Sequence, residues 1–425
     1  MSVSAKKLKK KHVRKRSGTA KWHMSREAVN LPLADIYKMD ELECWKFFVQ
    51  ARFGSKDTVR CPYCGSIGRH YFRLHDKRWK CHGCKSTFTV TTGTMFAQHK
   101  LSLRELLIGA LTWVNSAAGQ PALELKRHVD KSYNTAFTLQ HKLREALMRG
   151  YNVGLLNGDI EMDGALQAGF NAADKRGVPR GDPDAKPGLS DKDIEEKSKK
   201  LTALAQQNER NEKQRQATAA GTPLETGIAG RRSKDARLLI VVRKRSGVKG
   251  RGAVGSRVAI ALTESDDIAK SVIDDFVANH ESYLNTDGAT GFAGQKDFFL
   301  GHRTVTHSKQ LVGPNGENNN QAEELNFRYD RTEKGTHLNI EFKYMLDYAV
   351  ETAFRSDTRR LANGDQLRIA LNMALSVGVS KFWRGFTRGR HRIVEMLHPL
   401  PRVAPSSGPM KGRHPISSAN GRPPR

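Results

Sequence analysis

The sequence predicts a mixed α/β chain in which a small cysteine-rich unit and a helical unit precede a larger domain that contains a sheet. Two Cys-x-x-Cys pairs bracket short β-type runs between residues 61 and 90, and helix-period apolar positions follow over 101–150. After residue 150, short β-type runs at 238–242 and 258–262 are followed by helical patterns at 266–279 and 341–355. With 425 residues, the chain is long enough for two or three domains.

The chain carries a large excess of positive charge. Its 72 Lys and Arg residues against 44 Asp and Glu give a net charge of +28, which is far too basic for a typical metabolic enzyme and predicts a polyanionic partner. No apolar run approaches the roughly 20 residues that a bilayer-spanning helix needs, and the first residues lack an apolar signal segment. We therefore expect a soluble, cytoplasmic protein with no membrane partner.

Four of the five cysteines predict a metal site. Cys61 and Cys64 form one Cys-x-x-Cys pair, and Cys81 and Cys84 form a second after sixteen intervening residues. Four thiolates at tetrahedral geometry suit zinc, and such a closed site stabilises structure without catalysing a reaction. Redox chemistry is the main alternative, which the lack of a surrounding βαβ pattern disfavours. Cys44 stands alone and is predicted to be a buried core residue.

Three helical patterns follow the cysteine region, at 102–113, 122–129 and 132–148. Pro121 suits the first turn of the second helix, and Ser132 suits the cap of the third. Two helices joined by a short turn suggest a helix-turn-helix, whose third helix would present these residues to DNA: Lys131, Asn134, Gln140, Lys142 and Arg144. An ordinary three-helix packing unit is the alternative, and the net charge favours DNA binding.

Three acidic residues form a candidate catalytic set. Asp163 and Asp287 each follow a β-type run, and Glu323 stands at the start of a predicted helix. Each alone has a structural interpretation, the aspartates as turn formers beside Gly and the glutamate as an acid in a first helical turn. Together they are what two divalent metal ions need to flank a scissile phosphate about 4 Å apart.

The order of these features resembles the bacterial insertion-sequence transposases of the ISXO-two-like group, over roughly residues 38–170 and 236–360. The resemblance rests on the cysteine ribbon, the helical unit, Glu-x-Asp at 161–163, Thr-Asp-Gly at 286–288 and the Asn-x-x-Glu that ends at Glu323. It extends to Thr-Thr-Gly-Thr at 91–94, to His-Ser-Lys at 307–309, and to the spacing of Gly335, Lys343, Tyr348, Glu351 and Arg355.

The resemblance implies an RNase H-like fold, a mixed sheet flanked by helices, with a DDE-type active site. Asp163, Asp287 and Glu323 match the three acids that hold two Mg²⁺ ions in the group, which Mn²⁺ could replace. The implied activity is that of a DNA transposase that binds the terminal inverted repeats of its element, hydrolyses the phosphodiester there and joins the end to target DNA. The implied partners are double-stranded DNA and at least one further copy of the chain at the bacterial nucleoid, with no nucleotide cofactor.

Two departures from the group's pattern bear on the site. Gly164 stands where the group usually has Glu, and Asp330 stands seven residues after Glu323, where Lys or Arg is usual. Counting from Glu324 gives Arg331 instead, so either Glu324 is the third acid, or Arg328 or Arg331 supplies the cation differently. We prefer Glu323, because its distance from Gly335 fits. A DNA-binding regulator, an inactive domesticated transposase and a metal-dependent nuclease without joining activity are the alternative functions.

These features predict five regions. They are a disordered basic arm over 1–33, a zinc-ribbon region over 34–98, a helical DNA-binding unit over 99–150, a catalytic domain over 151–398 with a polar insertion at about 171–235, and a disordered basic tail over 399–425. The Gly-x-Gly-x-x-Gly at 250–255 lies between two β-type runs and opens no helix, so it predicts a hairpin turn and no dinucleotide site.

Overall fold

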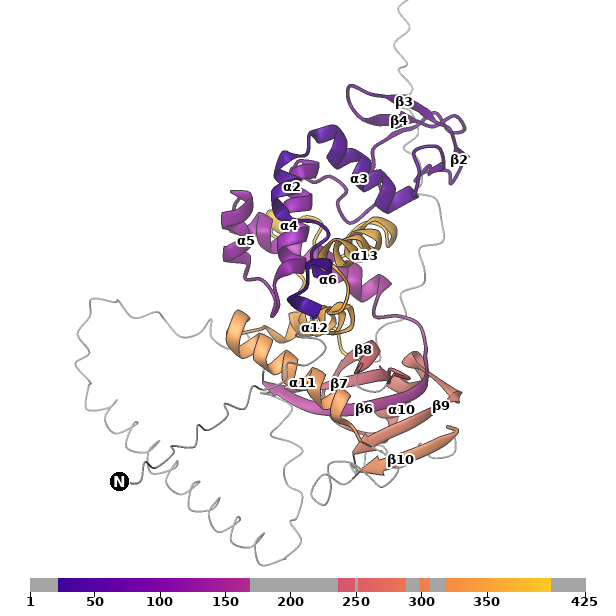
Figure 1. Cartoon of the computed structure of the whole chain (residues 1–425), viewed down its shortest axis with the longest axis vertical. Coiled ribbons are helices and arrows are strands. Elements are labelled where there is room, and N and C mark those ends of the chain that lie inside the picture. The colour runs from indigo at the N-terminus through magenta and orange to yellow at the C-terminus, as the bar shows by residue number, and fades with distance from the viewer. Residues whose placement is uncertain (1–21, 169–235, 249–250, 288–298, 306–317, 399–425) are drawn as a thin grey trace, which may run out of the picture.

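The computed structural model describes residues 22–168, 236–248, 251–287, 299–305 and 318–398 (Figure 1). The predicted insertion, the predicted C-terminal tail, the first 21 residues and the His-Ser-Lys motif at 307–309 therefore lie outside the described residues. The predicted arm extends too far, since residues 22–33 contain a helical turn at Arg26–Ala28 (η1) and the start of α2 (Leu33–Lys38). The side chain of Asn363 bonds the backbone amides of Asn30 and Leu31, which attaches this segment to the folded part of the chain.

The cysteine region folds as a ribbon beside α3 (Glu41–Phe53). Its strands are β1 (Val59–Arg60) with β2 (Ile67–Gly68), and β3 (Tyr71–Arg73), β4 (Arg78–Lys80) and β5 (Thr87–Phe88), all paired antiparallel. Asp40 and Glu43 form a capping box that fixes the start of α3. Trp45 of α3 lies 5.3 Å from Trp79 of β4 between ring centroids, so the helix covers one face of the ribbon.

The three predicted helices after the ribbon are present as α4 (Leu103–Asn115), α5 (Ala122–Val129) and α6 (Tyr133–Gly150). The hydroxyl of Ser132 accepts a hydrogen bond from the amide of Thr135, which confirms the predicted cap. α4 and α6 pack against two C-terminal helices, α12 (Met345–Thr358) and α13 (Asn363–Ser376), as Figure 1 shows. The helical unit therefore shares its core with the end of the chain.

A five-stranded mixed sheet forms the centre of the larger domain. Its strands are β6 (Leu156–Ala168), β7 (Ala236–Arg245), β8 (Ala253–Ala261), β9 (Val277–Asp287) and β10 (Gly301–Val305). They lie in the order β10-β9-β6-β7-β8; β7 pairs antiparallel with β6 and β8, while β9 pairs parallel with β6 and β10. This order and these directions are RNase H-like, which confirms the predicted fold class.

The pairing of β6 with β7 continues to Ala168 and Ala236, at the two ends of the long intervening segment. At the other end of β7, an antiparallel hairpin joins it to β8, as predicted for the glycine-rich segment. Gly252 there has φ +76°, a left-handed conformation that favours glycine.

Helices cover both faces of the sheet. α10 (Asp266–Phe276) packs on the face that carries Ile160, Met162 and Ile240. α11 (Asn320–Thr332) and α12 cover the other face, where Val241 and Val258 join the core that continues into the ribbon. Short helical segments at Glu333–His337 (η3), Phe342–Tyr344 (η4) and Phe386–Arg388 (η5) complete the fold.

Two helix predictions need correction. The helix predicted over 266–279 ends at Phe276, because the chain enters β9 at Val277 and pairs there with Leu156. The helical pattern at 341–355 begins as the turn η4 and becomes α12 only at Met345.

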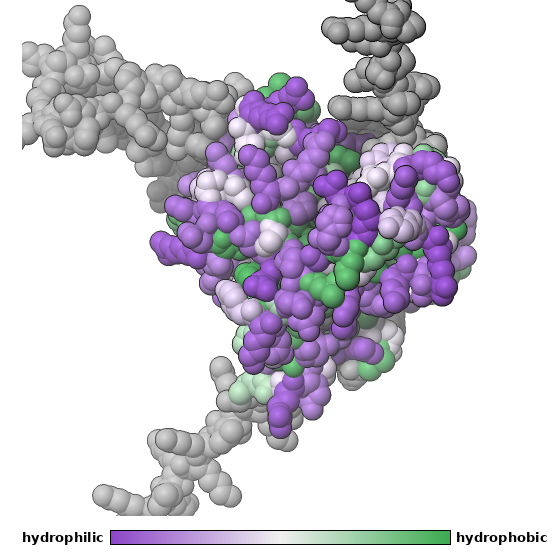
Figure 2. All heavy atoms as spheres, turned by 90° about the horizontal axis from the view of Figure 1, so that it is seen from above, coloured by the Kyte–Doolittle hydropathy of each residue, from purple (hydrophilic) through white to green (hydrophobic). Residues whose placement is uncertain are grey.

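In the part of the chain that the structure describes, no helix has both the length and the apolar composition to cross a bilayer. The face at the ribbon end is largely hydrophilic, with hydrophobic residues in small separate areas (Figure 2).

A buried ionic network joins α6 to α12. Arg144 of α6 donates to Glu351 of α12 at 2.5 Å, and both side chains are almost completely buried. Glu351 also accepts from Arg355, whose guanidinium bonds carbonyls near the end of α4, among them that of Trp113. Although burial opposes it, Arg144 and Arg355 lower the pKa of Glu351 to about 2, so the carboxylate is charged at neutral pH.

We expect Glu351→Gln to lower the free energy of unfolding by about 3–5 kcal/mol, because it leaves two buried guanidinium groups without their counter-charge. Urea denaturation followed by circular dichroism measures this loss. Asp274→Asn, on the exposed face of α10, is the matched control and should stay within about 0.5 kcal/mol. Equal stability of the two variants would contradict the structural role of Glu351.

Candidate active site and zinc centre

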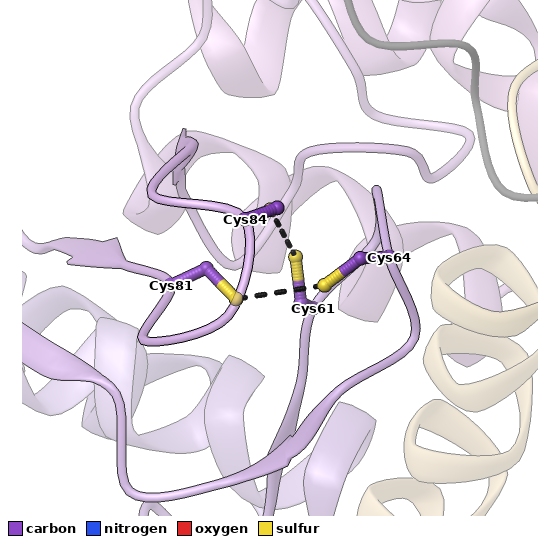
Figure 3. A group of neighbouring side chains, drawn as sticks. All are labelled: Cys61, Cys64, Cys81 and Cys84. Carbon is purple, nitrogen blue, oxygen red and sulfur yellow. Dashed lines mark hydrogen bonds between the residues drawn. The ribbon is translucent and has the colours of Figure 1, made fainter.

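The four cysteines of the ribbon meet at one point (Figure 3). Their Sγ atoms all lie within 4.8 Å of one another, with Cys61 and Cys84 at 3.7 Å and Cys64 and Cys81 at 3.6 Å. A tetrahedral zinc ion with Zn–S bonds of 2.3 Å has sulfur atoms ~3.8 Å apart, so these separations fit zinc. Cys44 is buried in the core away from this cluster, as predicted.

The thiols of the cluster differ in their acidity. Burial raises the pKa of Cys61 to about 12, whereas hydrogen bonds from Ser86 lower the pKa of Cys84 to about 6. Zinc binds thiolates, so a cation in the cluster would supply the charge that keeps the Cys61 sulfur deprotonated. With four sulfur ligands, the centre has no open coordination position and suits a structural role.

In the sheet, β6 carries an alternating series of acids. Asp159, Glu161 and Asp163 are two residues apart, so they lie on the same face of the strand, the face that α11 covers. The side-chain amide of Asn326 on α11 donates to Oδ2 of Asp163 at 2.6 Å. Asp163 is therefore held between the centre of the sheet and α11.

The sheet register brings Asp287 to the level of Asp163. β6 and β9 run parallel, with Met162 opposite Thr286, so the next residue on each strand is an aspartate. Asp287 is the last residue of β9 and pairs with Val305 of β10. The backbones of the two predicted catalytic aspartates thus lie on adjacent strands at the same height in the sheet.

The two candidate glutamates of α11 have different surroundings. Glu323 precedes Asn326 by three residues, so the two lie on the same face of the helix, the face directed at Asp163. Glu324 accepts from Arg328 at 2.6 Å and also pairs with Arg243 and Arg359. Although burial opposes it, these three arginines hold the pKa of Glu324 below its ordinary value. Glu323 therefore lies on the helix face directed at Asp163, whereas Glu324 is paired with arginines.

Glu161 joins α11 to the sheet. It is completely buried, and its Oε2 accepts from the backbone amides of Gln321 and Ala322 at 2.6 and 3.1 Å. The guanidinium of Arg245 donates hydrogen bonds to Glu161, to Asp159 and to the carbonyl of Asn318, just before the helix. Burial raises the pKa of Glu161, against the opposing effect of Arg245 and the two amides. The alternation of acids along β6 is the sequence signal for this role, which was not predicted.

Two amide oxygens beside the acids lack a hydrogen-bond donor among the described residues. They are Oδ1 of Asn285 on β9 and Oδ1 of Asn326 on α11, and both side chains are buried. Carboxylate and amide oxygens are ligands that Mg²⁺ accepts, so the donor set of this site fits a divalent cation.

The cations near Glu323 are already engaged or lie at other positions than the resemblance implies. Arg328 is paired with Glu324, and Asp330 forms an ion pair with Lys334 at 2.5 Å. Arg331 is exposed and lies over the ring of Phe327, so its guanidinium remains accessible to a ligand.

The structure corrects the predicted recognition helix. Gln140 and Arg144 are at most 1% exposed, because α6 is enclosed by neighbouring helices, so neither side chain can contact DNA in this structure. The amide of Gln140 donates to the carbonyl of Gln120, and Arg144 pairs with Glu351. The alternative, an ordinary helical packing unit, describes this half of α6 better.

The other DNA-binding predictions fall on accessible positions. Asn134 is exposed near the start of α6, Lys131 pairs with Glu105 at 2.8 Å while remaining partly exposed, and Lys142 is partly buried beside a cleft.

Two family models match the chain. The transposase zinc-ribbon domain matches residues 39–87, and the ISXO2-like transposase domain matches residues 197–357. These matches confirm that the chain resembles the ISXO2-like transposases. The ribbon match spans all four cysteines, and the second match includes Asp287 and Glu323 but begins after Asp163. No curated protein and no solved structure matches the chain.

For the zinc centre, we expect Cys81→Ser to abolish stoichiometric zinc binding and to lower the melting temperature, because the ribbon shares a core with α3. Elemental analysis of the purified protein and thermal denaturation measure the two effects. Cys44→Ala is the control, since it changes a buried cysteine outside the cluster and should retain the zinc. Full zinc content in Cys81→Ser would exclude the four-cysteine site.

For the α11 anchor, we expect Glu161→Gln to accelerate hydrogen exchange at the first turn of α11 by roughly 5- to 100-fold, the equivalent of about 1–3 kcal/mol. The variant replaces a charged acceptor of two amides and Arg245 with a neutral one. Mass spectrometry of peptides that contain Gln321 and Ala322 measures the rate. Glu324→Gln should leave those rates unchanged, and an unaltered rate in Glu161→Gln would contradict the anchoring role.

Proposed function

We propose that this transposase-family protein is an active DNA transposase that cuts and joins DNA at a site formed by Asp163, Asp287 and Glu323. The observation that carries the proposal is the position of two aspartates at the same level of adjacent parallel strands, where the Glu323 face of α11 is directed at Asp163. Asp163 and Asp287 are 124 residues apart in the chain, and the parallel pairing of β6 with β9 puts their backbones at the same level of the sheet.

The carboxylates of the site would hold two Mg²⁺ ions, for which Mn²⁺ is a possible substitute. Bound there, the ions would activate the attacking oxygen and stabilise the leaving oxygen of an in-line displacement. The residues of the chain have separate tasks. Asn326 orients the Asp163 carboxylate, while Glu161 and Arg245 fix the start of α11 and with it the position of Glu323.

The chemistry consists of two displacements at phosphorus. In the first, water attacks the phosphodiester at the end of the element, the bond from phosphorus to the 3′-oxygen breaks, and that oxygen leaves as a 3′-hydroxyl. In the second, this hydroxyl attacks a phosphodiester of target DNA, and the bond to the target's own 3′-oxygen breaks. Each step forms one P–O bond for the one it breaks, so no nucleotide cofactor is required.

The ends of the element are the proposed specific substrate. The net charge of +28 and the cations outside ion pairs support binding to duplex DNA, and contacts to its phosphates make such binding strongly dependent on salt. Joining two ends in one reaction requires at least two active sites, so we propose a homodimer or a larger assembly on DNA.

The test is an assay with purified protein, Mg²⁺ and labelled duplexes that carry the inverted repeats flanking the gene. Strand-transfer products are expected from the wild type, with a loss of roughly 10³-fold or more in Asp163→Asn, Asp287→Asn and Glu323→Gln. Glu324→Gln, whose carboxylate is held by arginines, is the matched control and should keep most of the activity.

Each other outcome identifies a different function. Cleavage without joined products would indicate a nuclease, and duplex binding without either product would indicate a regulator or an inactive transposase. Products that persist in Asp287→Asn would exclude the assigned acids.

A further inference from the structure

A cleft outside the acidic site has a strongly basic lining. Its volume is about 590 Å³, and three segments form most of it: residues 96–101 after the ribbon, residues 135–142 of α6, and residues 383–390 after α13. These segments come from both ends of the chain and meet because α6 packs against α13.

The cations of this cleft have few counter-charges. Among the described residues that line it are one His, two Lys and three Arg but no Asp or Glu; the six are His99, Lys100, Lys142, Arg384, Arg388 and Arg390. The sequence explains this, since it has no acidic residue between Asp76 and Glu105 or between Asp365 and Glu395.

The buried arginines elsewhere in the structure are neutralised differently. Arg144 and Arg243 each contact a carboxylate of α12, and Arg392 pairs with Asp347. Within the described residues, the side chains of Lys142, Arg388 and Arg390 have no such partner. Cations held close together without counter-charge repel one another, and a bound anion would remove that cost.

Lys142 shows this cost most clearly. Burial lowers the pKa of its ammonium group, and Glu145 is the acid that opposes this effect. Glu145 is already engaged, because its carboxylate accepts from Arg149 and from Ser380. Lys142 therefore faces the cleft without a hydrogen-bonded carboxylate of its own.

A further donor in the cleft suits an anion. The hydroxyl of Thr138 is buried and has no hydrogen-bond partner among the described residues. On the opposite wall, Gly385 and Gly389 take left-handed conformations with φ +87° and +81° and enclose the short helix η5, which carries Arg388. Arg390 donates its backbone amide to the carbonyl of Gly385, so the turn is closed.

We propose that this cleft binds the sugar–phosphate backbone of duplex DNA through Lys142, Arg388 and Arg390. Three or more cations along one cleft exceed what a single phosphate needs, whereas the closely spaced phosphates of a DNA strand match them. The contact is independent of base sequence and positions DNA on the surface formed by α6 and the C-terminal segment. The inference rests on the proposed function, since it supplies a DNA-binding surface in place of the buried Gln140 and Arg144.

The test measures how affinity for a duplex depends on salt. Fluorescence anisotropy between about 50 and 200 mM salt gives the slope of log affinity against log salt concentration for the wild type and for Lys142→Gln/Arg388→Gln/Arg390→Gln. Three lost phosphate contacts should reduce the slope by roughly 2–3, at about 0.9 per contact. Lys38→Gln/Lys46→Gln/Arg368→Gln removes the same charge from exposed positions outside the cleft and should keep the slope of the wild type.

The outcomes separate this inference from the proposed function. Absence of salt-dependent duplex binding in the wild type would contradict the proposed function itself. The wild type could show a steep slope that is unchanged in the cleft variant or reduced equally in both triple variants. Either result would contradict the cleft as a DNA-binding surface and leave the proposed function intact.

Chemical labelling tests the cleft without any substitution. Lys142 in the wild type should be protected from an amine-reactive reagent by duplex DNA, and not by inorganic phosphate at the same ionic strength. Equal protection by inorganic phosphate would overturn the DNA assignment in favour of a free-phosphate site, and no protection by either would overturn the cleft as an anion site.

Discussion

A central strand that carries carboxylates on a buried face sets the main constraint on this structure. β6 lies in the middle of the sheet, and three of its residues on one face are acids. Ionised carboxylates are costly to bury without partners, so the surrounding elements must supply them. Arg245 on β7, the amides that begin α11 and the side chain of Asn326 meet this need. The position of α11, and with it the candidate site, follows from the charge of β6.

The sequence predicted those parts of the fold that depend on local patterns. Short apolar runs located the strands around Ile240 and Ile260, and the two Cys-x-x-Cys pairs located the ribbon. α13 was not predicted. The end of α10 was placed too late, because only the pairing of Val277 with β6 shows that the chain is already extended there. Element boundaries set by tertiary pairing are not visible in a local pattern.

The candidate site likewise combines features that local sequence patterns predict with features that only the fold shows. The strand ends and the helix start predicted which acids to consider, whereas the pairing of Glu324 with Arg243 of β7 and with Arg359, just after α12, is visible only in the fold. α6 shows the limit of periodicity, since its polar residues look suited to DNA although Arg144 pairs with an acid more than two hundred residues away. A polar helix face can be satisfied by water, by a ligand or by a distant part of the chain. Periodicity alone does not distinguish these cases.

The ladder between β6 and β7 ends with Ala168 opposite Ala236, so the two ends of the intervening segment leave the sheet side by side, about 5 Å apart. β6 and β7, which carry Asp163 and Arg243, pair in register up to Ala168 and Ala236, the residues that flank this segment. The length of a segment attached at such a point has little influence on the ladder, since closing a longer loop costs only a logarithmic increase in entropy. This junction is therefore a suitable place to graft a fluorescent or affinity domain whose own termini are adjacent, with the catalytic strands left unaltered.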